Sequence, residues 1–106
     1  MRKVTVAAIQ MNNTRIVSEN IAKAEKLVRE AVEKGAQIIL LPELFERQYF
    51  CQERRYDYYD FAKKTEENDA VIHFRKICKE LSVVMPISFY EKDGNTLFNS
   101  VAVIDA

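Results

Sequence analysis

Residues 35–45 read GAQIILLPELF, and this stretch decides the fold. Its central run, residues 37–41, is apolar on both faces, which is typical of a strand in a parallel sheet that is covered on both sides. Pro42 ends this strand. Glu43 therefore follows the carboxyl end of a buried strand, which is where ligands bind in open α/β sheets. The stretch predicts an internal strand, with Glu43 two residues after it either as a functional carboxylate or as a residue that caps or solvates the loop.

The residues before this stretch predict a strand and a helix. Residues 4–9 form a short apolar run that indicates a first strand. A helix is expected next, with Ser18 as its N-terminal cap and Gly35 as its stop signal. The apolar stripe of this helix consists of Ile21, Ala24, Leu27, Val28, Ala31 and Val32. Strand, helix and buried strand in this order predict a right-handed βαβ unit.

The residues after the stretch predict a second helix and a terminal hairpin. Residues 44–68 are expected to form a loop with one or two short helical turns, and Asp69 to cap the second helix. The core face of that helix consists of Ala70, Phe74, Ile77, Cys78 and Leu81. Residues 83–90 indicate a strand in which Pro86 marks an edge or a bulge. An Asp-Gly-Asn turn joins it to an antiparallel partner at residues 97–104, so the predicted order is β-α-β-α-β-β, an α/β fold.

Composition excludes several classes of protein. The 106 residues carry 16 basic and 16 acidic side chains, whereas nucleic-acid binders usually show a basic excess. No apolar run is longer than that at residues 38–41, which is far too short to span a bilayer, and the N-terminus does not resemble a signal peptide. We therefore expect a single cytoplasmic domain, or a piece of one, with neither nucleic-acid nor membrane partners.

The stretch around Glu43 resembles the signature that surrounds the catalytic glutamate of the nitrilase superfamily of carbon–nitrogen hydrolases. Other segments agree in order: AAIQ at residues 7–10, Asn20 where the family's first helix commonly begins, and Asn-Ser at residues 99–100. The resemblance implies that residues 1–106 are the N-terminal portion of a single carbon–nitrogen hydrolase domain. It also implies a nitrilase-type α-β-β-α sandwich, in which two sheets pack face to face between outer helices.

Longer motifs are similar to those of the N-carbamoylputrescine amidase group within that superfamily. They are PELFERQYFCQ at residues 42–52, PISFYE at residues 86–91 and LFNSVAVIDA at residues 97–106. One departure is Arg47-Gln48, where many members carry a glycine before the tyrosine. The resemblance implies a small-molecule N-carbamoyl amine as substrate, a homo-oligomer, and no cofactor.

The resemblance also assigns catalytic roles. In this family a cysteine thiolate attacks the carbonyl carbon, a glutamate transfers protons, and a lysine helps to hold the oxyanion. Glu43 matches the glutamate, and the lysine and cysteine are expected downstream of residue 106. Buried neighbours are expected to disfavour the charged form of Glu43, which would make it a better proton acceptor. Tyr49 is the aromatic residue expected nearest the pocket, with plain core packing as the alternative.

Three further residues invite a catalytic interpretation. Cys51 lies eight residues after Glu43, but the family's nucleophile follows a later strand, so we expect Cys51 to be a packed or pocket-wall residue. Cys78 lies on the core stripe of the second helix, and His73 on its flank, where a surface or half-buried structural role is expected. The two cysteines lack metal-like spacing, so no metal site is predicted.

Alternatives to the N-carbamoylputrescine hypothesis remain open. The chain could be a truncated, non-catalytic module that associates with a partner chain, or part of an amidase for another N-carbamoyl or ω-amide substrate. A nucleotide-binding domain is disfavoured because no glycine-rich phosphate loop follows the first strand. Two helices can cover only one face of the strand at residues 37–41. Its other face is therefore predicted to bury against a second sheet, and the isolated chain to self-associate.

Overall fold

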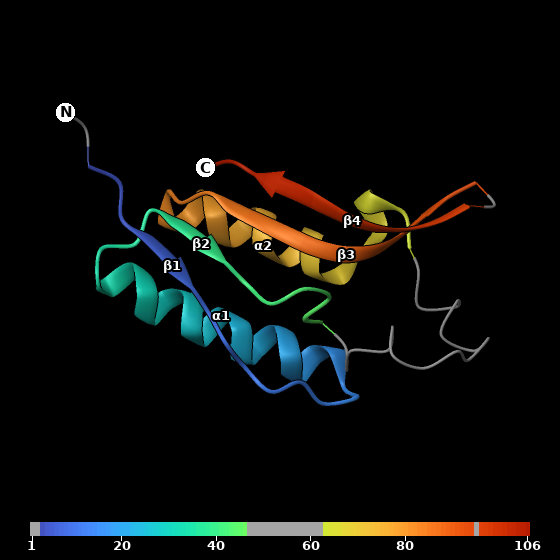
Figure 1. The fold of residues 1–106 in the computed structure, drawn as a ribbon, viewed down its shortest axis with the longest axis horizontal. Helices are drawn as coiled ribbons and strands as arrows, with labels where there is room; N and C mark the ends of the chain where they lie inside the picture. The colour runs from blue at the N-terminus through green and yellow to red at the C-terminus, as the bar shows by residue number, and fades with distance from the viewer. Residues whose placement is uncertain (1–2, 47–62, 95) are drawn as a thin grey trace.

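The structure, a computed structural model, describes residues 3–46, 63–94 and 96–106. Two helices pack side by side against one face of a sheet (Figure 1). The elements in chain order are β1 (Val6–Ala8), α1 (Val17–Glu33), β2 (Ile38–Leu40), the 3-10 helix η2 (Thr65–Glu67), α2 (Asp69–Leu81), β3 (Met85–Asp93) and β4 (Thr96–Ile104). The predicted β-α-β-α-β-β order and the terminal hairpin are confirmed.

The four strands follow one another across the sheet. β1 and β2 pair in parallel, and β3 and β4 pair antiparallel from Met85 opposite Ile104 to Asp93 opposite Thr96. A parallel bridge at Val84 joins the two pairs: Val84 N donates to the Gln37 carbonyl at 3.0 Å, and Ile39 N donates to the Val84 carbonyl at 3.0 Å. The strand that was predicted to be internal, β2, therefore lies between β1 and β3.

Pro86 lies where the pairing between β2 and β3 ends. Donors on one edge of a strand recur at every second residue, so the next donor after Val84 toward β2 would be residue 86, and proline has no N–H. The pairing of β3 with β4 continues past Pro86 opposite Val103 in unbroken register. Among the described residues, Pro86 therefore marks the point where one edge of β3 loses its β2 neighbour, rather than a bulge.

The start of α1 differs from the prediction. The helix begins at Val17, so Ser18 lies in its first turn instead of capping it, and the capping position is Ile16 with no side-chain cap. The hydroxyl of Thr14 accepts the Ile16 amide at 3.2 Å just outside the helix. The prediction was wrong because it treated the first serine before the apolar stripe as the cap. The helix extends further toward the N-terminus than that stripe. At the other end Gly35, with a φ of 95°, follows the helix as predicted.

The cap of α2 is also one residue away from the prediction. Asn68, not Asp69, occupies the capping position, and its side-chain oxygen accepts the Val71 amide at 3.0 Å. Asp69 is the first residue of the helix, where its negative charge interacts favourably with the helix dipole and where it pairs with Lys63 at 3.3 Å. Neither Asn68 nor Asp69 is unusual at a helix start, so local preference could not separate them.

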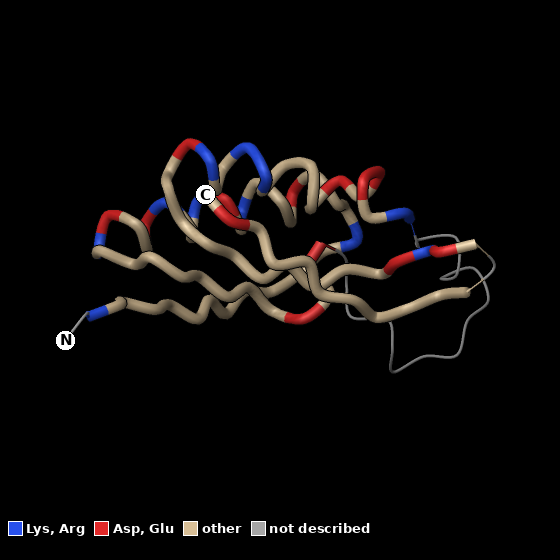
Figure 2. Tube along the Cα trace, turned by 90° about the horizontal axis from the view of Figure 1, so that it is seen from above, with Lys and Arg blue, Asp and Glu red and all other residues tan. Residues whose placement is uncertain are grey.

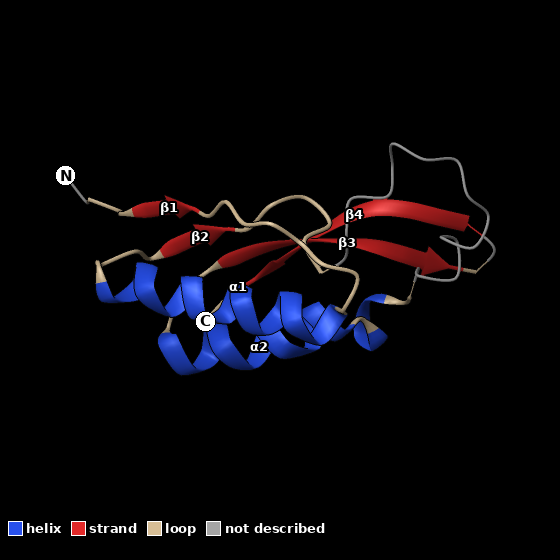
Figure 3. Cartoon of the chain, turned by 90° about the horizontal axis from the view of Figure 1, so that it is seen from below, coloured by secondary structure: helices blue, strands red, loops and turns tan. Residues whose placement is uncertain are grey.

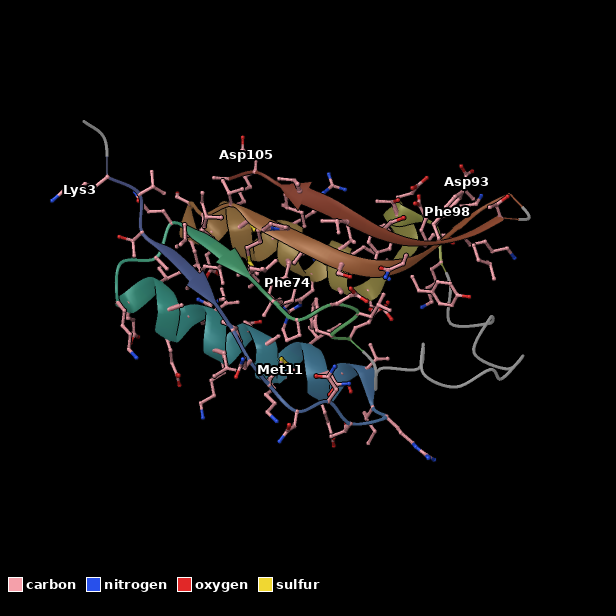
Figure 4. All side chains as sticks on the ribbon, viewed as in Figure 1. Lys3, Met11, Phe74, Asp93, Phe98 and Asp105 are labelled. Carbon is pink, nitrogen blue, oxygen red and sulfur yellow. The ribbon has the colours of Figure 1, made fainter. Side chains whose placement is uncertain are left out.

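The core lies between the helices and the covered face of the sheet. Figure 3 shows both helices on the same side of the strands, and Figure 4 shows Phe74 in the interior. The core residues on the elements are Ile21, Ala24 and Val28 of α1, Ala70, Val71, Phe74, Ile77 and Cys78 of α2, and Ile39, Met85, Ile87 and Phe89 of the strands. The predicted stripes of both helices thus form most of the helical side of this core.

The opposite face of the sheet is open and apolar. The side chains of Val6, Leu40, Val101 and Val103 on this face are 68%, 51%, 61% and 71% exposed, whereas Ile39, which points to the helices, is fully buried. The sequence-based expectation that only one face of β2 is covered is confirmed for these residues. Neither helix in the described parts of the chain has the length and apolar character that crossing a bilayer requires.

The open face leads to a prediction for residues 1–106 expressed alone. They are expected to self-associate, because contiguous exposed apolar surface drives association. Sedimentation velocity over a range of concentrations measures this directly. Val101→Lys combined with Val103→Lys is expected to shift the population toward monomer, while Ile72→Lys on the helical side is not. A monodisperse, cooperatively unfolding monomer of the unsubstituted chain would contradict the prediction.

Candidate functional site

Glu43 lies in a turn that follows β2 and runs onto the open face of the hairpin. Two contacts place this turn. Leu44 N donates to the Ser88 hydroxyl at 3.0 Å, and the Asn99 side-chain amide donates to Glu43 Oε1 at 3.2 Å. Ser88 pairs with Val101 in the ladder, so it belongs to the exposed face of β3. The carboxylate is therefore held beyond the end of β2, over the face of the sheet that the helices leave uncovered.

The backbone of this turn is unusual at Leu44. Its φ is 52°, in the left-handed region that residues with a side chain rarely adopt. Strain of this kind persists only where the surrounding structure holds the residue in place, and it is concentrated at functional sites. Here Leu44 is 2% exposed and donates its amide to Ser88, so burial and hydrogen bonding both hold the turn.

The buried neighbours that were expected beside Glu43 are present in its own turn, where Leu44 and Phe45 are buried. The Glu43 side chain itself is exposed, because the turn carries it over the open face of the sheet. The desolvation expected from the sequence would require further protein above this face.

Glu46, at the end of the same turn, is a buried residue that sequence analysis missed. It is 6% exposed, its side chain accepts the Asn68 amide at 2.9 Å, and its backbone carbonyl accepts the Asn20 amide at 2.9 Å. Asn20 was noted only for its place at the start of the first helix. The sequence signal for Glu46 was weak, because an acidic residue after an apolar pair is common on surfaces.

The other predicted residues lie away from Glu43 or outside the described residues. Tyr49 and Cys51 fall in the range 47–62, which the structure does not describe. Cys78 is fully buried in the core, as predicted, and burial raises the pKa of its thiol to about 11. The thiol is therefore neutral at physiological pH and is not a nucleophile.

His73 takes part in a charged cluster between the two helices. Its ring pairs with Glu25 at 2.5 Å, and Arg29 pairs with Glu25 at 2.9 Å and with Glu80 at 2.6 Å. His73 is half-buried, and the predicted structural role agrees with these contacts across α1 and α2. Both Glu25 and His73 also line an open groove of about 660 Å³ between the helices. This cluster connects the helical layer and does not contact the described part of the turn at Glu43.

The charged cluster predicts a pH dependence of stability. The hydrogen bond from Arg29, followed by that from His73, lowers the pKa of Glu25 below its usual 4.5, although burial opposes the shift. A lowered folded-state pKa means that the stabilising contribution is present above pH 4.5 and is lost as the pH falls through the folded-state value. The difference in thermal midpoint between the wild type and Glu25→Gln is therefore expected to shrink below that pH. A difference that stays constant from neutral pH to about pH 3 would contradict the assignment.

Charged residues lie mainly on the helical layer. Figure 2 shows basic and acidic residues interleaved along the helices, whereas the strands are mostly uncharged. Within residues 3–46, 63–94 and 96–106, no three histidine, cysteine, aspartate or glutamate side chains gather in a way that could hold a metal ion. Among the described residues, the candidate site is the turn that follows β2, where Glu43 and Leu44 bond to Asn99 and Ser88 of the hairpin.

Comparison with known proteins agrees with this fold and this signature. The model of the family described as Carbon-nitrogen hydrolase matches residues 5–106. The chain is 53% identical over 104 residues to N-carbamoylputrescine amidase of Oryza sativa subsp. japonica, covering 98% of this chain and 35% of the relative. It is 39% identical to Citrullinase of Francisella tularensis subsp. tularensis, covering 100% of this chain and 37% of the relative.

Solved structures agree on the fold. The crystal structure of carbon-nitrogen hydrolase from Helicobacter pylori G27 superposes with a TM-score of 0.84 at 22% sequence identity. The match covers 96% of this chain and 35% of that one, so the chain spans about a third of the length of the proteins it matches. The chain belongs to the carbon–nitrogen hydrolase family.

Proposed function

We propose that this chain supplies the proton-transferring glutamate, Glu43, of an enzyme that hydrolyses N-carbamoyl amines, with N-carbamoylputrescine as substrate. The observation that carries the proposal is the turn after β2, which holds the Glu43 carboxylate beside Asn99 at 3.2 Å. The proposal treats residues 1–106 as the N-terminal portion of one hydrolase domain. The cytoplasmic location and the homo-oligomer inferred from the sequence are part of the same proposal.

The proposed chemistry assigns Glu43 four proton transfers. Its carboxylate accepts the proton of a cysteine thiol, and the thiolate forms a bond to the carbamoyl carbon. Glu43 then protonates the leaving amine as the carbon–nitrogen bond breaks, which releases putrescine. It next takes a proton from the water that hydrolyses the thioester-like intermediate, and it returns that proton to the cysteine sulfur as the carbon–sulfur bond breaks. The carbamate so formed breaks down to ammonia and carbon dioxide. The cysteine and the oxyanion-stabilising lysine lie outside these 106 residues in this proposal.

Exposure of Glu43 to solvent in this chain suits the proposal only when further protein covers the open face. Proton transfer is most effective when the carboxylate is held in fixed geometry and shielded from water. Asn99 and Leu44 provide the fixed geometry, because they tie the carboxylate and its backbone to β4 and β3. The same proposal keeps Tyr49 as the substrate-binding aromatic residue nearest the pocket, from its match to the family motif.

Citrulline is the second candidate substrate, because one relative is named Citrullinase. Citrulline and N-carbamoylputrescine both end in a ureido group, and they differ in the amino-acid carboxylate that citrulline carries. The relative named Citrullinase is 39% identical over the whole chain, and those named N-carbamoylputrescine amidase are 46–53% identical. The higher identity supports the amine without a carboxylate as the preferred substrate.

Ammonia release from three substrates tests the proposal in the natural protein that contains this sequence. The substrates are N-carbamoylputrescine, citrulline and an ω-amide such as succinamate. We expect the highest kcat/KM for N-carbamoylputrescine, with stoichiometric putrescine. Preference for citrulline or for the ω-amide would replace the substrate while keeping the reaction class. A stable, folded protein that hydrolyses none of the three would overturn the proposed function and favour a non-catalytic module.

A further inference from the structure

Three buried polar side chains meet behind the turn that carries Glu43. Asn20 of α1 is 1% exposed, Glu46 at the end of the turn is 6% exposed, and Asn68 at the start of α2 is 1% exposed. Burying polar groups is costly unless they are hydrogen-bonded, so a buried group of this kind needs partners. Both asparagines bond to Glu46, one to its side chain and one to its backbone carbonyl, each at 2.9 Å.

Each asparagine stands in the first turn or at the cap of a helix and makes further hydrogen bonds there. The side-chain oxygen of Asn68 accepts the Val71 amide at 3.0 Å. Asn20 accepts the Thr14 amide and donates to the Thr14 carbonyl, both at 2.8 Å. Both donor hydrogens of the Asn20 amide are therefore used, one on Thr14 and one on Glu46. The two asparagines thus connect Glu46 to two rigid elements rather than to loops.

The turn is consequently held at both ends. At its start, Asn99 and Ser88 of the hairpin hold Glu43 and Leu44. At its end, Asn20 and Asn68 hold Glu46, three residues along the chain. Between them Leu44 adopts a positive φ, a conformation that persists only where the surrounding structure holds the residue in place.

We propose that Asn20, Glu46 and Asn68 are positioning residues that set the place of the Glu43 carboxylate, an inference that rests on the proposed function of Glu43. They do not touch substrate. They join the helical layer to the turn, so that the carboxylate keeps one position relative to the open face of the sheet. Correct placement of a reacting group accounts for a large share of enzymatic rate, and a displacement of about 1 Å can cost on the order of 100-fold.

Two substitutions at Glu46 test the role of its side chain in the natural protein that contains this sequence. Glu46→Ala removes the acceptor for Asn68, and we expect kcat to fall on the order of 100-fold with a much smaller change in KM. Glu46→Gln retains a side-chain oxygen that can accept the same hydrogen bond. We expect Glu46→Gln to keep most of the wild-type kcat. A large loss of kcat in this variant would mean that the charge of Glu46, and not only its hydrogen bond, is required.

A substitution at Asn68 separates helix capping from the contact with Glu46. Serine is a good capping residue, so Asn68→Ser retains an oxygen that can accept the Val71 amide but replaces the side-chain amide that donates to Glu46 with a shorter hydroxyl. We expect kcat to fall about tenfold, as for loss of a hydrogen bond to a carboxylate. In the double variant with Glu46→Ala, the two effects are expected to be non-additive, because both remove the same contact.

Ile77→Val is the control for a loss of stability that leaves the polar cluster intact. Ile77 lies in the core on α2 and takes no part in the polar cluster. This variant is expected to lower the thermal midpoint while leaving kcat unchanged at temperatures well below that midpoint. If Glu46→Ala lowers the midpoint and leaves kcat as in Ile77→Val, the three residues are merely structural and the inference is overturned.

Hydrogen exchange at the Leu44 amide gives a readout that does not depend on activity. This amide of the turn donates to Ser88 on β3, so its exchange is expected to be faster by about tenfold or more in Glu46→Ala and unchanged in Ile77→Val. Unchanged exchange in Glu46→Ala would overturn the positioning role. Loss of activity in Glu46→Ala together with full activity in Glu43→Gln would instead reject the proposed role of Glu43.

Discussion

Replacing Glu43 by glutamine is expected to lower kcat of the natural protein containing this chain by about 10²–10⁴-fold, the usual contribution of a general acid–base residue. Glutamine keeps the size of the side chain and an oxygen that can accept the hydrogen bond from Asn99, 3.2 Å from the carboxylate in the structure. It cannot take up the thiol proton. Steady-state kinetics of ammonia release measures the loss, and the thermal midpoint is expected to stay within experimental error.

The matched control for this prediction is Glu66→Gln on η2. Glu66 is an exposed glutamate in the described part of the chain and has no role in the proposed site, so its substitution is expected to leave kcat unchanged. The assignment of Glu43 fails if both variants retain near-normal turnover. A large loss in both would indicate a general effect of removing carboxylates rather than a role specific to Glu43.

Replacing Phe74 by alanine is expected to give the largest loss of stability. Phe74 is fully buried on α2, and its ring meets that of Phe45 edge to face, with centroids 5.7 Å apart. Removing a buried aromatic ring leaves a cavity and costs about 3–5 kcal/mol. Because Phe45 belongs to the turn that carries Glu43, the cavity is also expected to lower kcat in the protein that remains folded. Urea-induced unfolding followed by circular dichroism measures the change in the free energy of unfolding.

Ile72→Ala is the control for Phe74→Ala. Ile72 lies two residues away on the same helix but is 40% exposed and borders the open groove between the helices, so its truncation leaves no enclosed cavity. A change within about 0.5 kcal/mol is expected there. A loss below about 1 kcal/mol for Phe74→Ala would show that the core between α2 and the turn can collapse around the missing ring. That result would contradict the close packing of Phe74 against Phe45.

The elements that were predicted well are those with a strong local period. The stripes of both helices repeat at helical spacing, and their members Ala24, Val28, Phe74 and Cys78 are fully buried in the structure. The terminal hairpin follows from two strand-like runs around a turn signal and is confirmed, and the structure adds its register, in which Met85–Asp93 pair with β4. Helix starts were less predictable, because adjacent residues such as Asn68 and Asp69 are equally suited to the N-terminal capping position.

The environment of Glu43 could be predicted only in part. Its place after a buried strand follows from residues 35–45, because a run of apolar residues followed by proline specifies both the strand and its end. Its exposure could not be inferred from those residues, since exposure depends on what lies above the open face of the sheet. The polar cluster behind it was likewise hidden, because Glu46 bonds to Asn20 and Asn68, 26 and 22 residues away in the chain.

The order of strands and helices, the faces of the helices that form the core, and the position of Glu43 beyond the end of β2 can all be read from the sequence. These features depend on the spacing of apolar residues and on glycine and proline, which act over a few neighbouring residues. The side chains that meet around the turn, in contrast, are set by tertiary packing. Hydrogen bonds such as those of Glu46 with Asn20 and Asn68 need groups brought together from distant segments within a few ångströms. Local spacing along the chain does not encode that approach, and folding of the helices onto the sheet produces it.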